Sequence, residues 1–129
     1  MLNIIILVFA GGALGAILRE LLMLGVPHLS DGFPLDILVA NVGAAFLLGL
    51  ASGLHQRRLL SDNLNVMIGT GIMGGLSTFS SFVYGAYVLM TASATGMVVA
   101  VIYLLVSLAL GYGAVVLGLR IGTQRQKAP

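Results

Sequence analysis

The sequence contains no cysteine, and only 8% of its 129 residues are charged. Without cysteine there is neither a disulfide nor a thiolate metal site, and the redox compartment cannot be read. Six Lys or Arg residues, scattered along the chain, are too few for a nucleic-acid surface. No Ser/His/Asp grouping, metal-ligand spacing or P-loop occurs. All four carboxylates lie near the ends of apolar segments or between them: Glu20, Asp31, Asp36 and Asp62. This placement argues against a membrane proton relay and against an enzyme.

Apolar residues dominate what remains. They make up 59% of the chain, and the mean hydropathy is +1.10, so we expect the chain to lie in a lipid bilayer. Apolar runs predict an all-α, multi-pass membrane protein with one domain, 1–129, whose four spans cover about 2–24, 35–54, 64–90 and 97–119. The first run is longer than a signal peptide's apolar region and lacks a basic segment before it, so we expect it to be retained.

Basic residues in the loops predict the orientation. Five of the six fall on the side that holds both termini: Arg57, Arg58, Arg120, Arg125 and Lys127. By the positive-inside rule both termini lie in the cytoplasm and the chain lies in the cell membrane.

Small and polar residues interrupt the first two spans. Gly11 and Gly15 have the G-x-x-x-G spacing that lets helices approach closely, and Gly49 and Gly53 repeat it in span two. Arg19 either extends to the headgroups or lines a vestibule that attracts anions. An amide such as Asn41 within a membrane helix either joins helices or faces a pathway.

The third span carries two glycines and four hydroxyl residues at its midpoint, within Gly74–Phe82 (GGLSTFSSF). Glycine is a poor helix former, and Ser and Thr compete for backbone hydrogen bonds. This segment is therefore either a helix-packing face or a broken helix that builds an ion site. Phe79 and Phe82 share a helix face, and ring edges turned inward favour an anion. Tyr103 and Ser107, one turn apart in span four, either pack or donate hydrogen bonds to the same path.

These motifs resemble those of the Fluc (CrcB) fluoride channels over essentially the whole chain. The segments GGALGA before Arg19, Asn41 with Gly49, and Tyr103 with Ser107 support the resemblance, and GGLSTFSSF is similar to the most specific family signature. The family implies passive fluoride export through two pores in an antiparallel, dual-topology dimer with a second copy of the chain. It also implies a break at the centre of the third helix, where backbone carbonyls of Gly74 and Ser77 bind a structural Na⁺. The pore residues implied by the resemblance are Asn41, Phe79, Phe82, Ser80, Ser81, Tyr103 and Ser107, with Arg19 in the vestibule.

Some positions depart from the family pattern. Asp36 and Ile37 stand where the family usually has Gly-Thr, Ala44 replaces a frequent Gly, and Gly85 replaces a frequent Glu. Two other functions remain open: a proton-coupled exporter of organic cations, which needs a carboxylate inside a span, and a structural or non-selective pore protein. Selective ion flux separates the channel from both.

Overall fold

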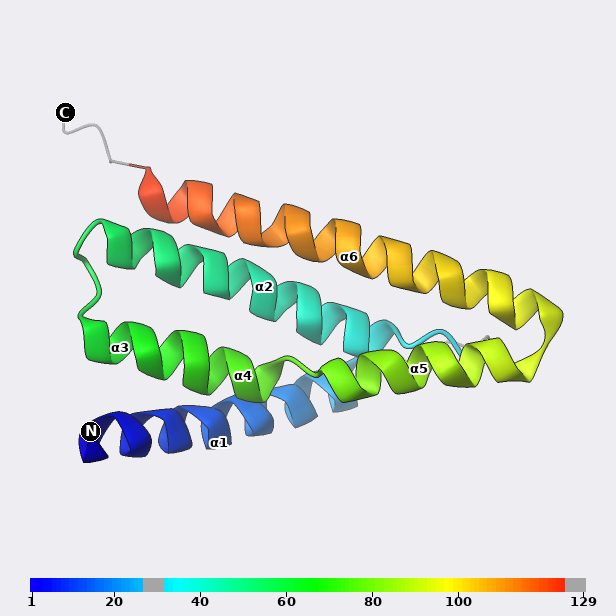
Figure 1. Cartoon of the computed structure of the whole chain (residues 1–129), viewed down its shortest axis with the longest axis horizontal. Helices are drawn as coiled ribbons and strands as arrows, with labels where there is room; N and C mark the ends of the chain where they lie inside the picture. Colours follow the sequence, from blue (N-terminus) through cyan, green and yellow to red (C-terminus); the bar gives the residue numbers. More distant parts are fainter. Residues whose placement is uncertain (27–31, 125–129) are drawn as a thin grey trace.

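The computed structural model describes residues 1–26 and 32–124 (Figure 1). Asp31, Arg125 and Lys127 lie outside these ranges. Every regular element within them is helical: α1 (Leu2–Gly25), α2 (Leu35–Gln56), α3 (Asp62–Val66), the π-helix η1 (Met67–Ile72), α4 (Met73–Leu76), α5 (Phe79–Ala92) and α6 (Ala94–Thr123).

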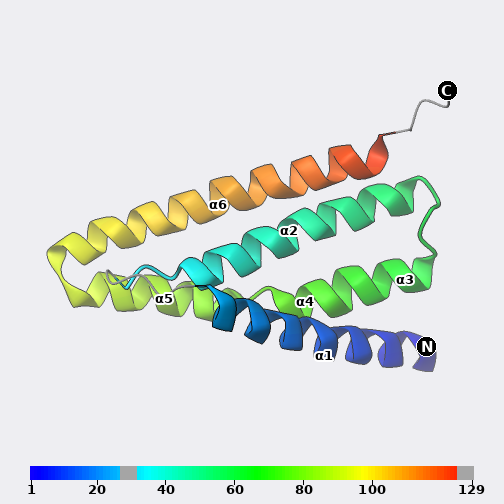
Figure 2. The ribbon, with the colours of Figure 1, turned by 180° about the vertical axis from the view of Figure 1, so that it is seen from behind.

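Within the two described ranges, four helical segments are long and apolar enough to cross a membrane: Leu2–Gly25, Leu35–Gln56, Asp62–Ala92 and Ala94–Thr123. The prediction of an all-α chain with four membrane-spanning segments is confirmed. The N-terminus, the C-terminal end of α6 and the α2–α3 connection lie at one end of the molecule, and the α5–α6 connection lies at the other (Figures 1 and 2).

The turn before the fourth span is shorter than the six residues, 91–96, that separate the predicted spans 64–90 and 97–119. Only Ser93 lies between α5 and α6, and its backbone is extended. Its hydroxyl accepts a hydrogen bond from Gly96 N at 2.9 Å, which caps α6 and lets the helix begin at Ala94.

Glycines set the helix pairing. The two largest contacts join α2 to α6 and α1 to η1. A Cβ at Gly49 would lie 2.1 Å from the Val115 carbonyl oxygen, and one at Gly118 would lie 2.1 Å from that of Phe46. On the other side, a Cβ at Gly15 would lie 2.1 Å from the Ile72 carbonyl oxygen. The predicted close approach at the small-residue spacings is confirmed, because any larger side chain would push these backbones apart.

The third membrane segment has different neighbours along its length. Its first part, η1 and α4, packs against α1, whereas α5 packs against α6. Buried residues of α2, α5 and α6 form one small core around Tyr103, and Ala44, Met73 and Leu76 form a second. The junction between α4 and α5 therefore lies where the two halves of the molecule meet.

Candidate functional site

The backbone leaves helical geometry between α4 and α5. Ser77 has φ −76° and ψ 154°, and Thr78 has φ −145° and ψ 110°, so both residues are extended. They follow Gly74 and Gly75, which hold a helix weakly, and they fall within the hydroxyl cluster GGLSTFSSF. Extended backbone inside a membrane segment needs polar partners from the protein, because lipid supplies none.

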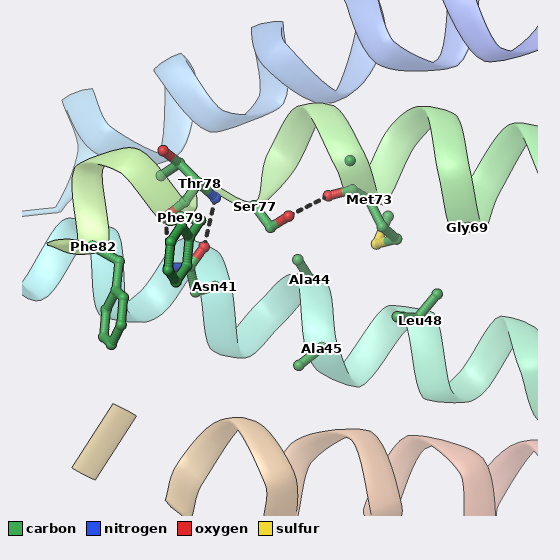
Figure 3. A pocket seen from close by; sticks show the side chains of 11 residues that line it. Asn41, Ala44, Ala45, Leu48, Gly69, Met73, Ser77, Thr78, Phe79 and Phe82 are labelled. Atoms are coloured by element: carbon green, nitrogen blue, oxygen red, sulfur yellow. Dashed lines mark hydrogen bonds between the residues drawn. The ribbon is translucent and has the colours of Figure 1, made fainter. Parts of the chain in front are cut away.

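Asn41 supplies those partners from α2 (Figure 3). Thr78 N donates to Asn41 Oδ1 at 2.7 Å, and Asn41 Nδ2 donates to the Thr78 carbonyl oxygen at 3.2 Å. One side-chain amide therefore satisfies both main-chain groups of Thr78, in the manner of a neighbouring strand. Asn41 therefore joins α2 to the third span, which is one of the two roles that the sequence allowed for it.

Hydroxyls satisfy the rest of the junction. Thr78 Oγ1 accepts from Ser81 N at 3.2 Å and donates to Ser81 Oγ at 2.9 Å, so Thr78 caps α5. Ser77 Oγ donates to the Met73 carbonyl oxygen at 2.8 Å. Thr78, which is 7% exposed, is absent from the pore residues expected from the sequence. A Thr preceding a run of helix-forming residues is an N-cap signal that could have found it.

A groove of about 400 Å³ opens beside the junction. Its polar walls come from Asn41, Ser77 and Thr78, and Gly74 lies at its rim, where a Cβ would meet no atom within 4 Å. Phe79 projects from this groove with 78% of its surface exposed. The remaining lining is apolar: Ala44, Ala45, Leu48, Gly69, Met73 and Phe82.

Four aromatic rings continue from the groove into the core. The ring centroids of Phe79 and Phe82 are 6.1 Å apart, and those of Phe82 and Tyr103 are 5.4 Å apart. Phe33 then meets Tyr103 at 5.4 Å, with an interplanar angle of 86°. Such edge-to-face contact is the favoured arrangement for aromatic pairs. Phe33 was not expected from the sequence, since it precedes α2 and no spacing links it to Tyr103.

Two hydroxyls on α6 are buried without partners. Neither Tyr103 Oη nor Ser107 Oγ has a hydrogen-bond partner within residues 1–26 and 32–124. A buried hydroxyl left unpaired costs free energy, so each is a donor available to a ligand. Both lie one turn apart on the same helix, as their spacing predicts.

The expected site residues do not all meet in one place. Asn41, Phe79, Phe82, Gly74 and Ser77 line the groove, whereas Ser81 bonds to Thr78 and Tyr103 contacts Phe82. The others lie outside the groove lining: the exposed Ser80, the partly buried Ser107 and the partly buried Arg19 of α1.

Two of the departures from the family pattern are neighbours. A Cβ at Gly85 would lie 3.0 Å from Pro34 Cγ and 3.8 Å from Ile37 Cδ1. Ile37, the larger residue, therefore lies beside Gly85, which has no side chain, at one contact between α2 and α5. Asp36 precedes this contact in the first turn of α2.

Carboxylate or imidazole metal ligands do not gather in the described part of the chain, where no group of three or more His, Cys, Asp or Glu occurs. A cation at the junction would depend on backbone oxygens instead.

Comparison with known proteins identifies the class. The family model described as CrcB-like protein, Camphor Resistance (CrcB), matches residues 6–119, and the chain belongs to this family. It is 55% identical over 124 residues to the fluoride-specific ion channel FluC 3 of Yersinia pseudotuberculosis, covering 96% of this chain and 92% of that relative. It is 56% identical over 122 residues to FluC 2 of Brucella melitensis, covering 95% of this chain but 45% of the relative. The chain thus spans less than half the length of that Brucella relative. The predicted family is confirmed, and both of these relatives are named fluoride-specific ion channels.

Proposed function

We propose that this chain is a subunit of a channel that conducts fluoride passively out of the cell. The observation that carries the proposal is the pair of buried, unpartnered hydroxyls of Tyr103 and Ser107, on the helix whose Tyr103 ring contacts Phe82. The names of the relatives, fluoride-specific ion channels, support the choice of ion.

The proposed path uses weak donors rather than a fixed positive charge. No Lys or Arg occurs between 36 and 54, between 64 and 90, or between 97 and 119. Asn41 keeps one N–H beyond the one that it gives to Thr78, because its amide carries two. Ring edges of Phe79 and Phe82 and the hydroxyls of Ser80, Ser81, Tyr103 and Ser107 complete the path. Several weak contacts in succession replace an anion's hydration shell without trapping it.

A second copy of the chain, inverted in the membrane, is the proposed partner. The groove is open on one side, Phe79 is largely exposed, and a Cβ at Gly43 or Gly74 would meet nothing within 4 Å. These features leave room for close approach by another helix, and an inverted copy would give each pore residues from both subunits. Residues 1–26 and 32–124 hold one four-span unit, and a second, inverted copy would supply the symmetry-related one.

A structural Na⁺ is proposed between the two subunits, held by the backbone carbonyls of Gly74 and Ser77. The residues fit such an ion: Ser77 is extended at the junction, and Gly74, in the last turn before it, carries no side chain to obstruct approach. Hard cations are commonly held by carbonyl oxygens at interrupted membrane helices. When bound, the ion would stabilise the negative oxygen ends of these carbonyl groups.

Arg19 is proposed to raise the local anion concentration at the pore mouth. It is partly buried on α1, and no ion pair to it occurs in the described part of the chain. A free guanidinium near a narrow entrance attracts anions through the field that it creates.

Fluoride efflux from liposomes that contain only the purified chain tests the proposal. We expect rapid fluoride efflux and little chloride efflux. Tyr103→Phe, which removes only the buried hydroxyl, should slow fluoride efflux. Tyr112→Phe, the matched control at a tyrosine that is 75% exposed, should not. Equal chloride and fluoride flux would indicate a non-selective pore, and proton-driven uptake of an organic cation would indicate an exporter.

A further inference from the structure

The carbonyl oxygens of Gly74 and Ser77 have both lost the N–H donor that a continuous α-helix would provide. In a continuous α-helix, the Gly74 carbonyl accepts from Thr78 N–H and the Ser77 carbonyl accepts from Ser81 N–H, four residues on. In this chain both donors are used elsewhere. Thr78 N–H goes to Asn41 Oδ1 at 2.7 Å, and Ser81 N–H goes to Thr78 Oγ1 at 3.2 Å.

Asn41 lies 37 residues before its partner and in another helix, so the first diversion is a tertiary interaction. The amide of Asn41 matches a peptide group, with one acceptor and one donor side by side. That match lets it pair with both main-chain groups of the extended Thr78, at 2.7 and 3.2 Å. A serine in its place has one oxygen and a shorter reach, and a leucine has no polar atom.

We propose that Asn41 is a positioning residue that keeps the third span interrupted. Its side chain takes the Thr78 N–H that would otherwise close a helical turn onto the Gly74 carbonyl, and so leaves that carbonyl free for a cation. Thr78 Oγ1 does the same for the Ser77 carbonyl by taking Ser81 N–H. The inference deepens the proposed function, since the freed carbonyls are those proposed to bind Na⁺.

The same two side chains orient the aromatic rings. Thr78 caps α5, which begins at Phe79, so the position of Thr78 determines where the Phe79 and Phe82 side chains lie. If Thr78 N–H returned to the Gly74 carbonyl, the helix would continue through Ser77 and Thr78. The direction of α5 relative to α4 would then change, and both rings would move with it.

The wild-type chain provides the first test, which involves no mutation. Nuclear magnetic resonance of the isotope-labelled protein should show a through-hydrogen-bond coupling between Thr78 ¹⁵N and the side-chain carbonyl carbon of Asn41. The ¹³Cα shifts of Ser77 and Thr78 should have extended values. Absence of the coupling, in a spectrum that resolves backbone couplings within α2, would overturn the proposal.

Two pairs of variants provide the second test. Asn41→Leu should move the Ser77 and Thr78 ¹³Cα shifts toward helical values, and Asn65→Leu, the matched control in α3, should leave them unchanged. Thr78→Val removes the hydroxyl that accepts from Ser81 N–H, so a new coupling between Ser81 ¹⁵N and the Ser77 carbonyl carbon should appear. Thr70→Val in η1 should not produce this coupling. Unchanged shifts in Asn41→Leu would overturn the proposal. If that variant does not fold, the wild-type coupling decides.

A sodium titration separates positioning from direct contact with fluoride. The half-maximal Na⁺ concentration for dimer formation should rise at least about tenfold in Asn41→Leu, the factor expected for a lost hydrogen bond at a buried site. Phe82→Ile should leave it unchanged. An equal Na⁺ requirement in wild type and Asn41→Leu would contradict the proposed role. If wild type shows the coupling but conducts no fluoride, the proposed function fails and the positioning role stands.

Discussion

Gly118→Ala tests how closely α2 and α6 approach. A Cβ at this position would lie 2.1 Å from the Phe46 carbonyl oxygen and 2.8 Å from Leu50 N. The first distance is 0.9 Å shorter than the 3.0 Å below which real Cβ contacts are essentially never found. Both neighbours are backbone atoms of one helix, so no rotamer change can relieve the overlap. The helices must separate or rotate.

The cost follows from the length of the contact. Gly49, Gly53 and Gly122 lie on the same seam, and a Cβ at each would also come within 3.0 Å of backbone. Separation at Gly118 therefore loosens the whole α2–α6 contact. We expect a loss of about 3 kcal/mol in the free energy of unfolding, the upper end of the range for overpacked sites. That loss corresponds to a factor of about 100 in the unfolding equilibrium.

Gly113→Ala is the matched control on the same helix. A Cβ there would meet nothing within 4 Å, and alanine favours a helix over glycine by roughly 0.5–1 kcal/mol. Unfolding of each variant in mixed detergent micelles, followed by helical circular dichroism, gives the comparison. If Gly118→Ala and Gly113→Ala unfold at the same denaturant concentration, close approach of these backbones does not hold the subunit together.

Four further outcomes are expected. Phe82→Ile keeps apolar bulk but removes the ring, so fluoride efflux from liposomes should fall by about tenfold or more while the dimer survives; wild-type flux would show that the ring only packs. Arg19→Lys keeps the charge and should retain most of the flux. Replacing Na⁺ by a large organic cation should promote dimer dissociation in detergent, and equal dissociation in both would mean that the protein itself satisfies the carbonyls. Reporters fused to the C-terminus should be detected on both sides of the membrane, because the proposed partner is an inverted copy of the chain. The loop charges favour the cytoplasm alone, and detection only there would point to a different partner chain.

Hydropathy and residue chemistry predicted the large features. Four apolar runs identified the four spans, and the extended residues Ser77 and Thr78 fall within the Gly and hydroxyl cluster that weakens a helix. G-x-x-x-G spacing predicted close packing but not which helices would pair, because a small residue accepts any neighbour.

Contacts between residues far apart in the sequence could not be predicted from it. Asn41 and Thr78 are 37 residues apart, and nothing in the local pattern of either helix indicates that one amide pairs with that backbone. The contact of Phe33 with Tyr103 likewise depends on the path of the chain before α2. The sequence therefore indicated Asn41 and Ser77, which line the groove, but neither Thr78 nor the hydrogen bonds that define the shape of the junction.

Helix pairing in this fold also has a consequence for synthesis of the chain in the membrane. The first two spans are consecutive, yet α1 packs mainly against η1 and α4, and α2 packs mainly against α6. Both spans must enter the bilayer before their partners exist, with Gly11, Gly15, Gly49 and Gly53 facing lipid. Span one acquires its partner when residues 67–76 are inserted, whereas span two acquires its partner only when α6 is inserted. The largest helix contact, that of α2 with α6, therefore forms only after α6 has left the ribosome. A chain that ends before Ala94 would hold α2 and α5 without their principal neighbour.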